Sequence, residues 1–232
     1  MNILSVGHIN TGYDKKQVLF DINFDIKQGE CVLLVGSNGS GKSTLFKAIY
    51  RNLDLWNKNG KIIYNDEDIS KLKTHQLIKK GIVYIPQKDE LFEDLTVLEN
   101  LELSILHLNN KKDTKLRIKT VLEQIPTLKQ ELEQEVNNLS GGERKLLSLA
   151  MALLNQPKVL LYDEPLSGLS NENIKSLIVY LKEIKEQETT LVLVEHRIKE
   201  LLPLTDRVIG LKLGQQNKQE LNTIESIKTF LI

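Results

Sequence analysis

The sequence of 232 residues has one cysteine, no net formal charge and no long apolar run, and each scarcity excludes a class of protein. Cys31 lies in the apolar stretch CVLLV. A single cysteine cannot form a disulfide within the chain, which fits a reducing cytoplasm, and we expect it to be a buried small hydrophobic residue. The 31 basic and 31 acidic residues cancel. This balance favours neither a broad electrostatic grip on anionic lipid nor a nucleic-acid partner, and we expect none.

Targeting and membrane-spanning segments are also lacking. The first residues, MNILSVGHIN, have neither the basic region nor the long apolar stretch of a secretory signal. No run approaches the roughly 18 apolar residues that a membrane-spanning helix needs. The sequence therefore predicts a soluble cytoplasmic protein, which can still dock on a membrane protein from the cytoplasmic side.

What the sequence does contain is an alternation of apolar strands and helices. The runs CVLLV, KVLLYDE and TTLVLVEH are continuous, as in strands of a parallel sheet that helices cover on both faces. A helical stripe over 174–184 separates the second run from the third, so the order argues for a doubly wound α/β core. Residues 18–26 predict a half-exposed antiparallel strand. Leucine, lysine and glutamate dominate 95–139, which predicts a mainly helical lobe inserted between strands.

Local signals refine this reading. Thr96 and Glu99 have the spacing of a capping box. A helix is predicted over 45–51 and a short one near 224–231. We assign the chain to one domain, with the core and its β subdomain at 1–86 and 156–232 and the helical subdomain at 87–155.

The stretch GSNGSGKS, from Gly36 to Ser43, matches the phosphate-loop pattern G-x-x-x-x-G-K-[ST], and it follows a predicted strand and precedes a predicted helix. Glycines let the backbone turn its N–H groups toward phosphate oxygens, and the helix start adds its positive end. Lys42 is expected to reach the terminal phosphates, Ser43 to hold Mg²⁺ and Thr44 to lie near the inner phosphates. The ordinary alternative is a glycine-rich turn with a surface lysine. Adenylate kinase-like proteins and GTPases share this loop, so it does not by itself identify the protein.

Polar side chains follow three other predicted strands. Asp163 and Glu164 end one of them, where ligands bind in open α/β sheets. Asp163 is suited to Mg²⁺, and Glu164 to polarising a water aimed at the γ-phosphate. His196 and Gln87 come after two further strands and are expected to contact the γ-phosphate, the metal or the water. Each of these residues alone would be unremarkable, because solvated turn carboxylates and structural histidines are common.

A second anion site is predicted at LSGGE, residues 139–143. Ser140 and two glycines begin a helix that runs to about Leu154, and helix starts of this kind bind anions. One nucleotide does not need two such sites. The second is therefore expected to serve the nucleotide of a neighbouring chain.

The pieces GSNGSGKST, YIPQ, LSGGERK, VLLYDEP and VEH, in this order, resemble the ATP-binding cassette (ABC) ATPases over roughly residues 3–213. The resemblance implies a phosphate-loop NTPase core, an antiparallel β subdomain and an inserted helical subdomain. It also implies ATP and Mg²⁺ as cofactors and a head-to-tail dimer, of identical or related chains, with integral-membrane permease subunits. Tyr13 matches the aromatic residue that stacks on adenine in that family.

Motifs and resemblance together give a full set of expected site residues. The residues expected to act in catalysis are Lys42, Gln87, Glu164 and His196. The residues expected to hold the metal are Ser43, Gln87 and Asp163. The residues expected to bind the nucleotide are Tyr13, Gly36, Ser37, Asn38, Gly39, Ser40, Gly41, Lys42, Ser43, Thr44, Ser140, Gly141 and Gly142.

Two departures from the family are visible. Ser170 stands where members usually carry an aspartate, in a loop that crosses the dimer interface, which leaves the contacts of that loop open. The polar tail GQQNKQELN also departs from the family's usual closing hairpin.

The resemblance predicts an active ATPase subunit that powers a membrane transporter, peripheral on the cytoplasmic face of the membrane. The segment GIVYIPQKDELFEDLTVLENL is similar to ATPases of branched-chain amino-acid uptake and of lipopolysaccharide export. Two alternatives are kept: a soluble ABC ATPase of a non-transport machine, and a binding module that no longer hydrolyses ATP. The intact Lys42, Asp163, Glu164 and His196 argue against the second.

Overall fold

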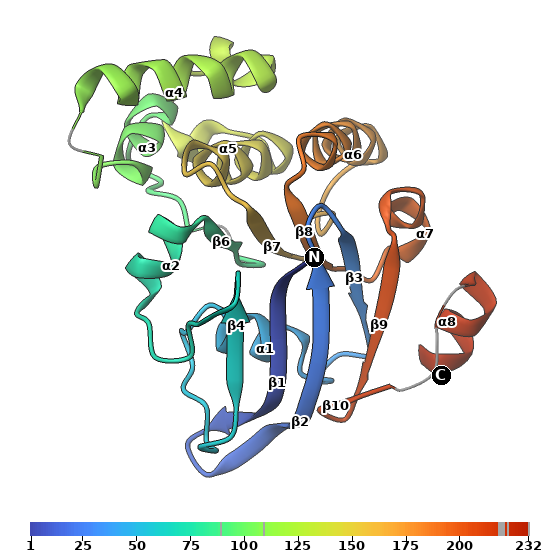
Figure 1. The fold of residues 1–232 in the computed structure, drawn as a ribbon. Coiled ribbons are helices and arrows are strands. Elements are labelled where there is room, and N and C mark those ends of the chain that lie inside the picture. The colour runs from blue at the N-terminus through green and yellow to red at the C-terminus, as the bar shows by residue number, and fades with distance from the viewer. Residues whose placement is uncertain (89, 109, 218–220, 222, 232) are drawn as a thin grey trace.

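A six-stranded sheet lies at the centre of the computed structural model, which describes residues 1–88, 90–108, 110–217, 221 and 223–231 (Figure 1). In spatial order the strands are β10 (Gln215–Gln216), β9 (Arg207–Lys212), β3 (Cys31–Val35), β8 (Thr190–Val194), β7 (Val159–Asp163) and β6 (Ile82–Ile85). All neighbours pair in parallel except β10, which pairs antiparallel with β9. The parallel sheet predicted from the apolar runs is confirmed.

A second, antiparallel sheet covers one side of the molecule. Its order is β2 (Lys16–Lys27), β1 (Asn2–Tyr13), β4 (Lys61–Tyr64) and β5 (Glu67–Asp68). Ile22, Phe24 and Ile26 of β2 are buried while their neighbours are exposed, as predicted for a half-exposed antiparallel strand. The sequence did not predict β1, its partner, whose pairing with β2 is interrupted by register shifts that break the alternation of apolar residues.

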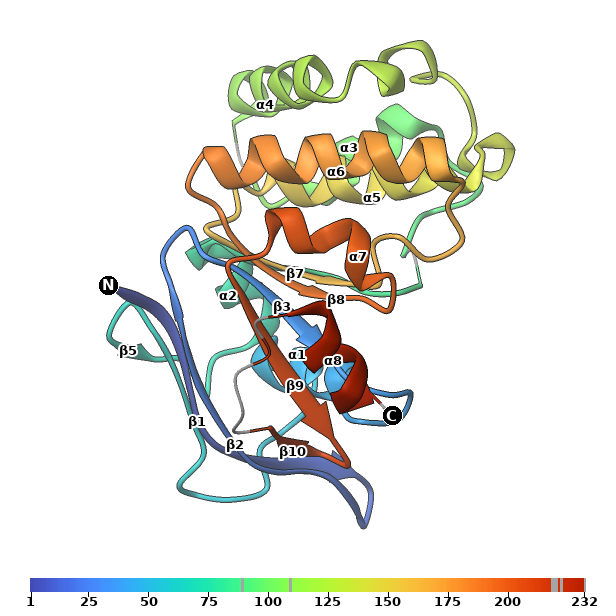
Figure 2. The same cartoon turned by 90° about the vertical axis from the view of Figure 1, so that its right-hand side faces the viewer.

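Helices fill the space on both faces of the six-stranded sheet (Figure 2). They are α1 (Lys42–Ile49), α2 (Thr74–Lys80), α3 (Val97–Ser104), α4 (Lys111–Gln124), α5 (Gly141–Leu154), α6 (Asn171–Glu186), α7 (Ile198–Leu201) and α8 (Ile224–Leu231), with 3-10 turns at Pro126–Gln130, Val136–Asn138 and Leu202–Leu204. Helices α3 to α6 lie above the sheet, and α1 lies between the two sheets. All three helices of the predicted lobe, α3, α4 and α5, come between β6 and β7 in the chain.

Each central strand contributes alternate side chains to two hydrophobic cores, one on each face of the six-stranded sheet. In β3, Cys31, Leu33 and Val35 pack toward the upper helices, whereas Val32 and Leu34 pack toward α1 and the antiparallel sheet. All five residues are fully buried, because alternate side chains of a strand point to opposite faces. Burial also raises the pKa of the Cys31 thiol to about 12. Cys31 is therefore a small core residue, as the sequence predicted.

Most local predictions hold, and two details differ. Thr96 and Glu99 form the expected capping box at α3, and the last helix lies at the expected residues. Helix α1 begins at Lys42, not Leu45, because the loop glycines lead directly into its first turn. The tail that was expected to depart from the usual closing hairpin begins with one, since β10 pairs antiparallel with β9 through a turn at Gly214. The rest of that tail, at 218–220 and 222, lies outside the described residues.

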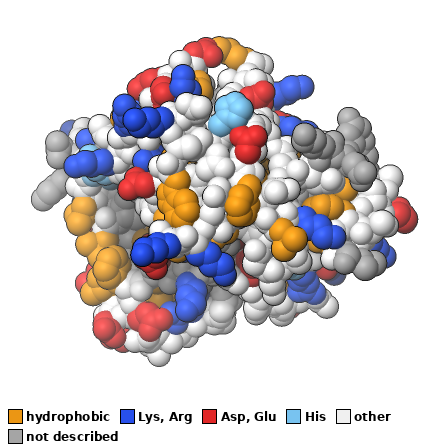
Figure 3. All heavy atoms as spheres, turned by 90° about the horizontal axis from the view of Figure 1, so that it is seen from below, with side chains coloured by type: hydrophobic (Ala, Val, Ile, Leu, Met, Phe, Trp, Pro, Cys, Tyr) orange, Lys and Arg blue, Asp and Glu red, His pale blue; other side chains and the backbone are white. Residues whose placement is uncertain are grey.

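The surface agrees with the balanced composition. On the face seen from below, basic and acidic side chains are interspersed and do not form separate fields (Figure 3). Within the described ranges, no helix combines the length and the apolar character that a bilayer span requires.

Candidate active site

The phosphate loop joins β3 to α1 in a conformation that requires glycine. Gly39 and Gly41 have φ angles of 77° and 103°, in the left-handed region. A Cβ at Gly41 would lie 2.6 Å from Leu19 Cδ2, and one at Gly36 would lie 2.3 Å from the carbonyl oxygen of Leu211. The loop is therefore pressed against β2 and β9, and side chains at these positions would force it out of place.

Lys42 closes over the loop that precedes it. Its Nζ donates to the carbonyl oxygens of Gly36 at 2.9 Å and Ser37 at 3.1 Å, and the residue is only 6% exposed. Burial lowers the pKa of Lys42, while the carboxylates of Glu164 and Asp163 act in the opposite direction. The lysine thus lies beside both acidic residues and fixes the curvature of the loop.

Asp163 ends β7 and is almost completely buried, at 1% exposure. Its Oδ2 accepts a hydrogen bond of 3.4 Å from the hydroxyl of Tyr84. Burial raises the pKa of Asp163, and hydrogen bonding to the Ser43 hydroxyl lowers it. Its Oδ1 is buried without a hydrogen-bond partner among the described residues. A buried carboxylate oxygen of this kind, next to a serine hydroxyl, suits a hard cation that binds oxygen ligands.

Glu164 brings together side chains from three strand ends. Its Oε2 accepts a 2.6 Å hydrogen bond from Nε2 of Gln87, and its Oε1 lies 3.2 Å from Nε2 of His196. The φ of Glu164 is 50°, a conformation that is uncommon outside glycine and that recurs at functional sites. Three residues predicted separately from the ends of different strands therefore meet at one carboxylate.

An open cavity of about 800 Å³ lies over this group. The expected site residues that line it are Asn38, Gly39, Gly41, Lys42, Ser43, Thr44, Gln87, Glu164 and His196. Its other walls come from residues 16–18 and Phe20 of β2 and from Leu213. Tyr13 is not among these lining residues. Its ring is partly exposed at the end of β1, with Nζ of Lys47 5.7 Å from the ring centroid.

The second predicted anion site lies elsewhere in the molecule. The hydroxyl oxygen of Ser140 caps α5 by accepting from the N–H of Glu143, and Glu143 accepts from the N–H of Ser140 in return. Gly141 and Gly142 form the first turn. None of these residues lines the cavity described above. A contact between Nζ of Lys145 and the carbonyl oxygen of Gln87, at 3.0 Å, joins α5 to the group around Glu164.

Sequence reasoning missed several residues that hold these motifs in place. Tyr84 supports Asp163, Lys145 contacts the backbone of Gln87, and Asn173 of α6 packs against Gly142. Tyr84 and Lys145 had a signal in the sequence, because they lie inside the quoted YIPQ and LSGGERK, whereas Asn173 had none. The contacts themselves join segments that are distant in the chain, which no local pattern predicts.

Gly142→Ala is expected to destabilise the protein more than Gly141→Ala. A Cβ at Gly142 would lie 2.2 Å from Nδ2 of Asn173, whereas nothing lies within 4 Å of one at Gly141. Turning the Asn173 amide away should cost about 1 kcal/mol of unfolding free energy. Urea unfolding of both variants measures the difference, and Asn173→Ala added to Gly142→Ala should remove it. Equal unfolding midpoints for the two alanine variants would contradict the contact.

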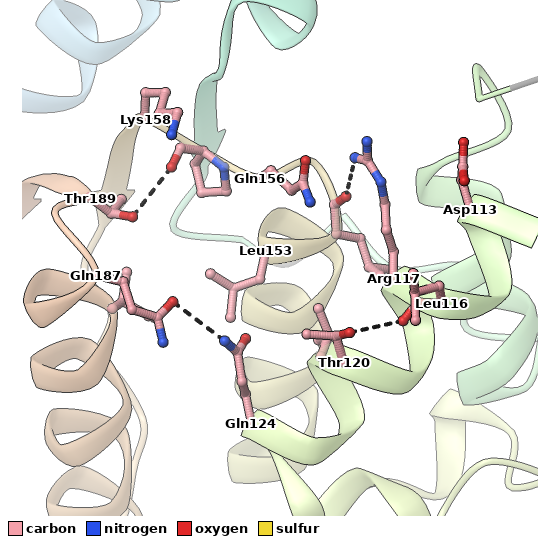
Figure 4. A pocket seen from close by; sticks show the side chains of 14 residues that line it. Asp113, Leu116, Arg117, Thr120, Gln124, Leu153, Gln156, Lys158, Gln187 and Thr189 are labelled. Atoms are coloured by element: carbon pink, nitrogen blue, oxygen red, sulfur yellow. Dashed lines mark hydrogen bonds between the residues drawn. The ribbon is translucent and has the colours of Figure 1, made fainter.

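A second cavity, of about 670 Å³, lies between α4 and the amino-terminal side of β7 and β8 (Figure 4). Arg117 donates to the carbonyl oxygen of Leu154, and Gln124 of α4 donates to Gln187 at 3.4 Å. None of the predicted motif residues lines this cavity. It is therefore separate from the group around Glu164.

Comparison with known proteins places this geometry in a family. The family model described as ABC transporter matches residues 19–167. The chain is 34% identical over 213 residues to the high-affinity branched-chain amino acid transport ATP-binding protein BraG of Pseudomonas aeruginosa, covering 92% of this chain and 90% of BraG. It is 30% identical over 221 residues to the lipopolysaccharide export system ATP-binding protein LptB of Haemophilus influenzae, covering 93% of this chain and 89% of LptB.

A solved structure gives the same result. The fold matches the dimeric, post-hydrolysis structure of the ATP-binding cassette MJ0796 bound to ADP and Pi, with a TM-score of 0.82 and 26% identity over 95% of this chain and all of that one. The chain belongs to the ABC transporter family. It is an ATP-binding and ATP-hydrolysing subunit of the kind that powers transport, as the motifs predicted.

Proposed function

We propose that the chain hydrolyses ATP at the cavity over Glu164, with Glu164 as the general base. The observation that supports this most directly is the carboxylate of Glu164, which is held between Gln87 and His196 at the edge of the phosphate loop. A carboxylate fixed by two neighbours can orient a water and accept its proton as the water attacks the γ-phosphate. His196 would contact the γ-phosphate, and Lys42 would leave the carbonyls of Gly36 and Ser37 to bind the terminal phosphates.

The phosphate loop supplies the rest of the binding site for the triphosphate. Backbone N–H groups of residues 36–44 and the start of α1 attract the phosphate oxygens. Tyr13 would stack on adenine, because its partly exposed ring lies at the end of the hairpin that borders the cavity. Lys47, close to that ring, adds a positive charge beside the nucleotide.

Mg²⁺ fits the residues present. Asp163 offers a buried oxygen that accepts no hydrogen bond from the described residues, and the hydroxyl of Ser43 lies next to this carboxylate. Gln87 uses its amide nitrogen for Glu164, so its amide oxygen is the atom that remains for a metal. When bound, the cation would neutralise charge on the phosphates. Mg²⁺ usually keeps several of its water ligands, so a site with few protein oxygens suits it.

The working form is proposed to be a head-to-tail dimer with an identical or related chain. Ser140, Gly141 and Gly142 lie away from the chain's own cavity, at the start of a 14-residue helix. The Ser140 oxygen already accepts one hydrogen bond, and its hydroxyl hydrogen can be donated to a phosphate oxygen. MJ0796, a protein of the same fold, is dimeric in its ADP and Pi form.

The membrane partner is proposed to be a permease that docks beside Gln87. A hollow of about 170 Å³ there is lined mainly by apolar side chains, most of them from β6 and α5, and Leu91 is one of its lining residues. By their names, the relatives BraG and LptB act in branched-chain amino acid transport and lipopolysaccharide export. We propose cargo of one of these two kinds and a location on the cytoplasmic face of the membrane. A non-transport machine built on the same ATPase is the alternative.

Leu91→Glu is expected to prevent copurification of the permease from solubilised membranes, because a charge would be buried against the partner's apolar segment. Val179→Glu, which replaces an exposed apolar residue of α6, is the matched control and should keep the partner. Mass spectrometry of the bound membrane protein identifies the permease. Retention of the same permease by the Leu91 variant would exclude this docking position, and the recovery of no membrane protein by any form would favour the non-transport alternative.

A further inference from the structure

Glu195 is a buried carboxylate directly before His196, and the mechanism above gives it no role. It follows β8 and is only 3% exposed. A carboxylate is costly to bury unless hydrogen bonds compensate for its lost hydration. Its partners therefore show what it holds.

The two oxygens of Glu195 bind two different loops. Oε1 accepts from the backbone N–H of His196 at 2.7 Å and from that of Arg197 at 3.1 Å. Oε2 accepts from the backbone N–H of Leu166 at 2.9 Å. Leu166 is the second residue after Glu164, in the loop that leads to α6. The carboxylate thus bridges the His196 loop and the loop of the proposed general base.

A second link joins the same two segments. The guanidinium of Arg197 donates to Oδ1 of Asn171 at 3.2 Å, at the start of α6. Ser170 caps that helix by accepting from the N–H of Asn173, and the side chain of Asn173 packs on Gly142. A chain of contacts therefore runs from His196, through the loop after Glu164, to the glycines that begin α5.

We propose that Glu195 is a positioning residue that makes the His196 loop and the loop after Glu164 move as one unit. A shift of His196 on contact with the γ-phosphate would then displace Leu166 and the start of α6, and with it the surface that Asn173 presents to Gly142. This inference rests on the proposed roles of Glu164 and His196. It also gives Ser170 a function in this chain, as the cap that anchors the far end of the moving loop.

The chemistry of the bridge requires a carboxylate. Glutamine has nearly the same shape but one acceptor oxygen, and its NH₂ group cannot accept from an N–H. In Glu195→Gln the side chain can therefore hold the His196 loop or the Leu166 loop, but not both. The variant uncouples the loops without leaving a cavity.

Glu195→Gln is expected to lower kcat for ATP hydrolysis roughly a hundredfold, as a small misplacement of catalytic groups does. KM for ATP should stay within about twofold of the parent value, because the phosphate loop is untouched. Steady-state phosphate release, with folded protein quantified by circular dichroism and ATP binding, gives both constants. Glu30→Gln is the matched control, since Glu30 also accepts a backbone N–H and pairs with Arg207 far from the cavity. It should lower stability and leave kcat unchanged.

If folded Glu195→Gln has the same kcat as the parent protein while Glu164→Gln is inactive, the inference is overturned. Should Glu195→Gln fail to fold, Arg197→Ala tests the second link at a partly exposed side chain. Loss of that hydrogen bond should lower kcat about fivefold, and an unchanged kcat would again refute the coupling. An inactive parent protein, or a Glu164→Gln variant at the parent rate, would instead contradict the proposed function itself.

Discussion

Replacing Glu164 by glutamine is expected to reduce steady-state ATP hydrolysis on the order of 10²- to 10⁴-fold while MgATP still binds. An amide of nearly the same shape can occupy the space between Gln87 and His196, but it cannot take the proton of the attacking water. Bound ATP is then not consumed, so the variant should accumulate as a closed dimer. Phosphate release measures the first effect, and size-exclusion chromatography with MgATP measures the second.

The matched control for this experiment is Glu183→Gln, which removes the same charge from an exposed position on α6. It should hydrolyse ATP at the parent rate and should not favour the dimer. Glu164 is not the base if its glutamine variant retains parent activity. A variant that is inactive, saturated with nucleotide and still monomeric, and that pairs with no related subunit, would contradict the shared two-chain site.

Lys42→Ala is expected to weaken ATP binding roughly a hundredfold, the usual scale for losing one partner of a buried charge pair. Lys42 is the cation that closes over the phosphate loop, and its removal also takes a donor from the carbonyl oxygens of Gly36 and Ser37, of which Ser37 still accepts from the N–H of Ser40. Isothermal titration with MgATP measures the affinity.

Lys79→Ala, at an exposed position on α2, is the matched control and should bind ATP like the parent. An unchanged affinity together with an unchanged rate of hydrolysis in the Lys42 variant would mean that the lysine stays on its own loop and does not reach the phosphates. A variant that binds normally but hydrolyses slowly would assign Lys42 to catalysis alone.

The sequence predicts those parts of this protein whose physical cause is local. Buried parallel strands appear as continuous apolar runs, and the phosphate loop appears as glycines before a lysine, because both depend on a few consecutive residues. The expected places of Gly36, Asp163, Glu164 and His196 at strand ends are confirmed by the sheet. The meeting of Gln87 and His196 at Glu164 follows from the parallel order of β6, β7 and β8, since neighbouring parallel strands end at the same edge of the sheet.

The rest depends on pairings that no local pattern encodes. The partner of β2 could not be identified, because the register shifts in β1 break its alternation. Asn173 and Gly142 touch only because α6 lies against α5 in the folded chain. In the sequence, Glu195 is a polar residue at the end of an apolar run. Its burial depends on the contact with Leu166, which is distant in the chain and is therefore not predictable from a local pattern. The role of Ser140 toward a second chain remains a prediction.

The complete burial of β3, β7 and β8 restricts where this fold can change. A strand without a solvent face tolerates few polar substitutions along its length, so new chemistry can be added only where the strand stops. With the docking position proposed above, a subunit of this kind could be redirected to another membrane partner by changing the surface next to Gln87 while the strands of the sheet are left unchanged.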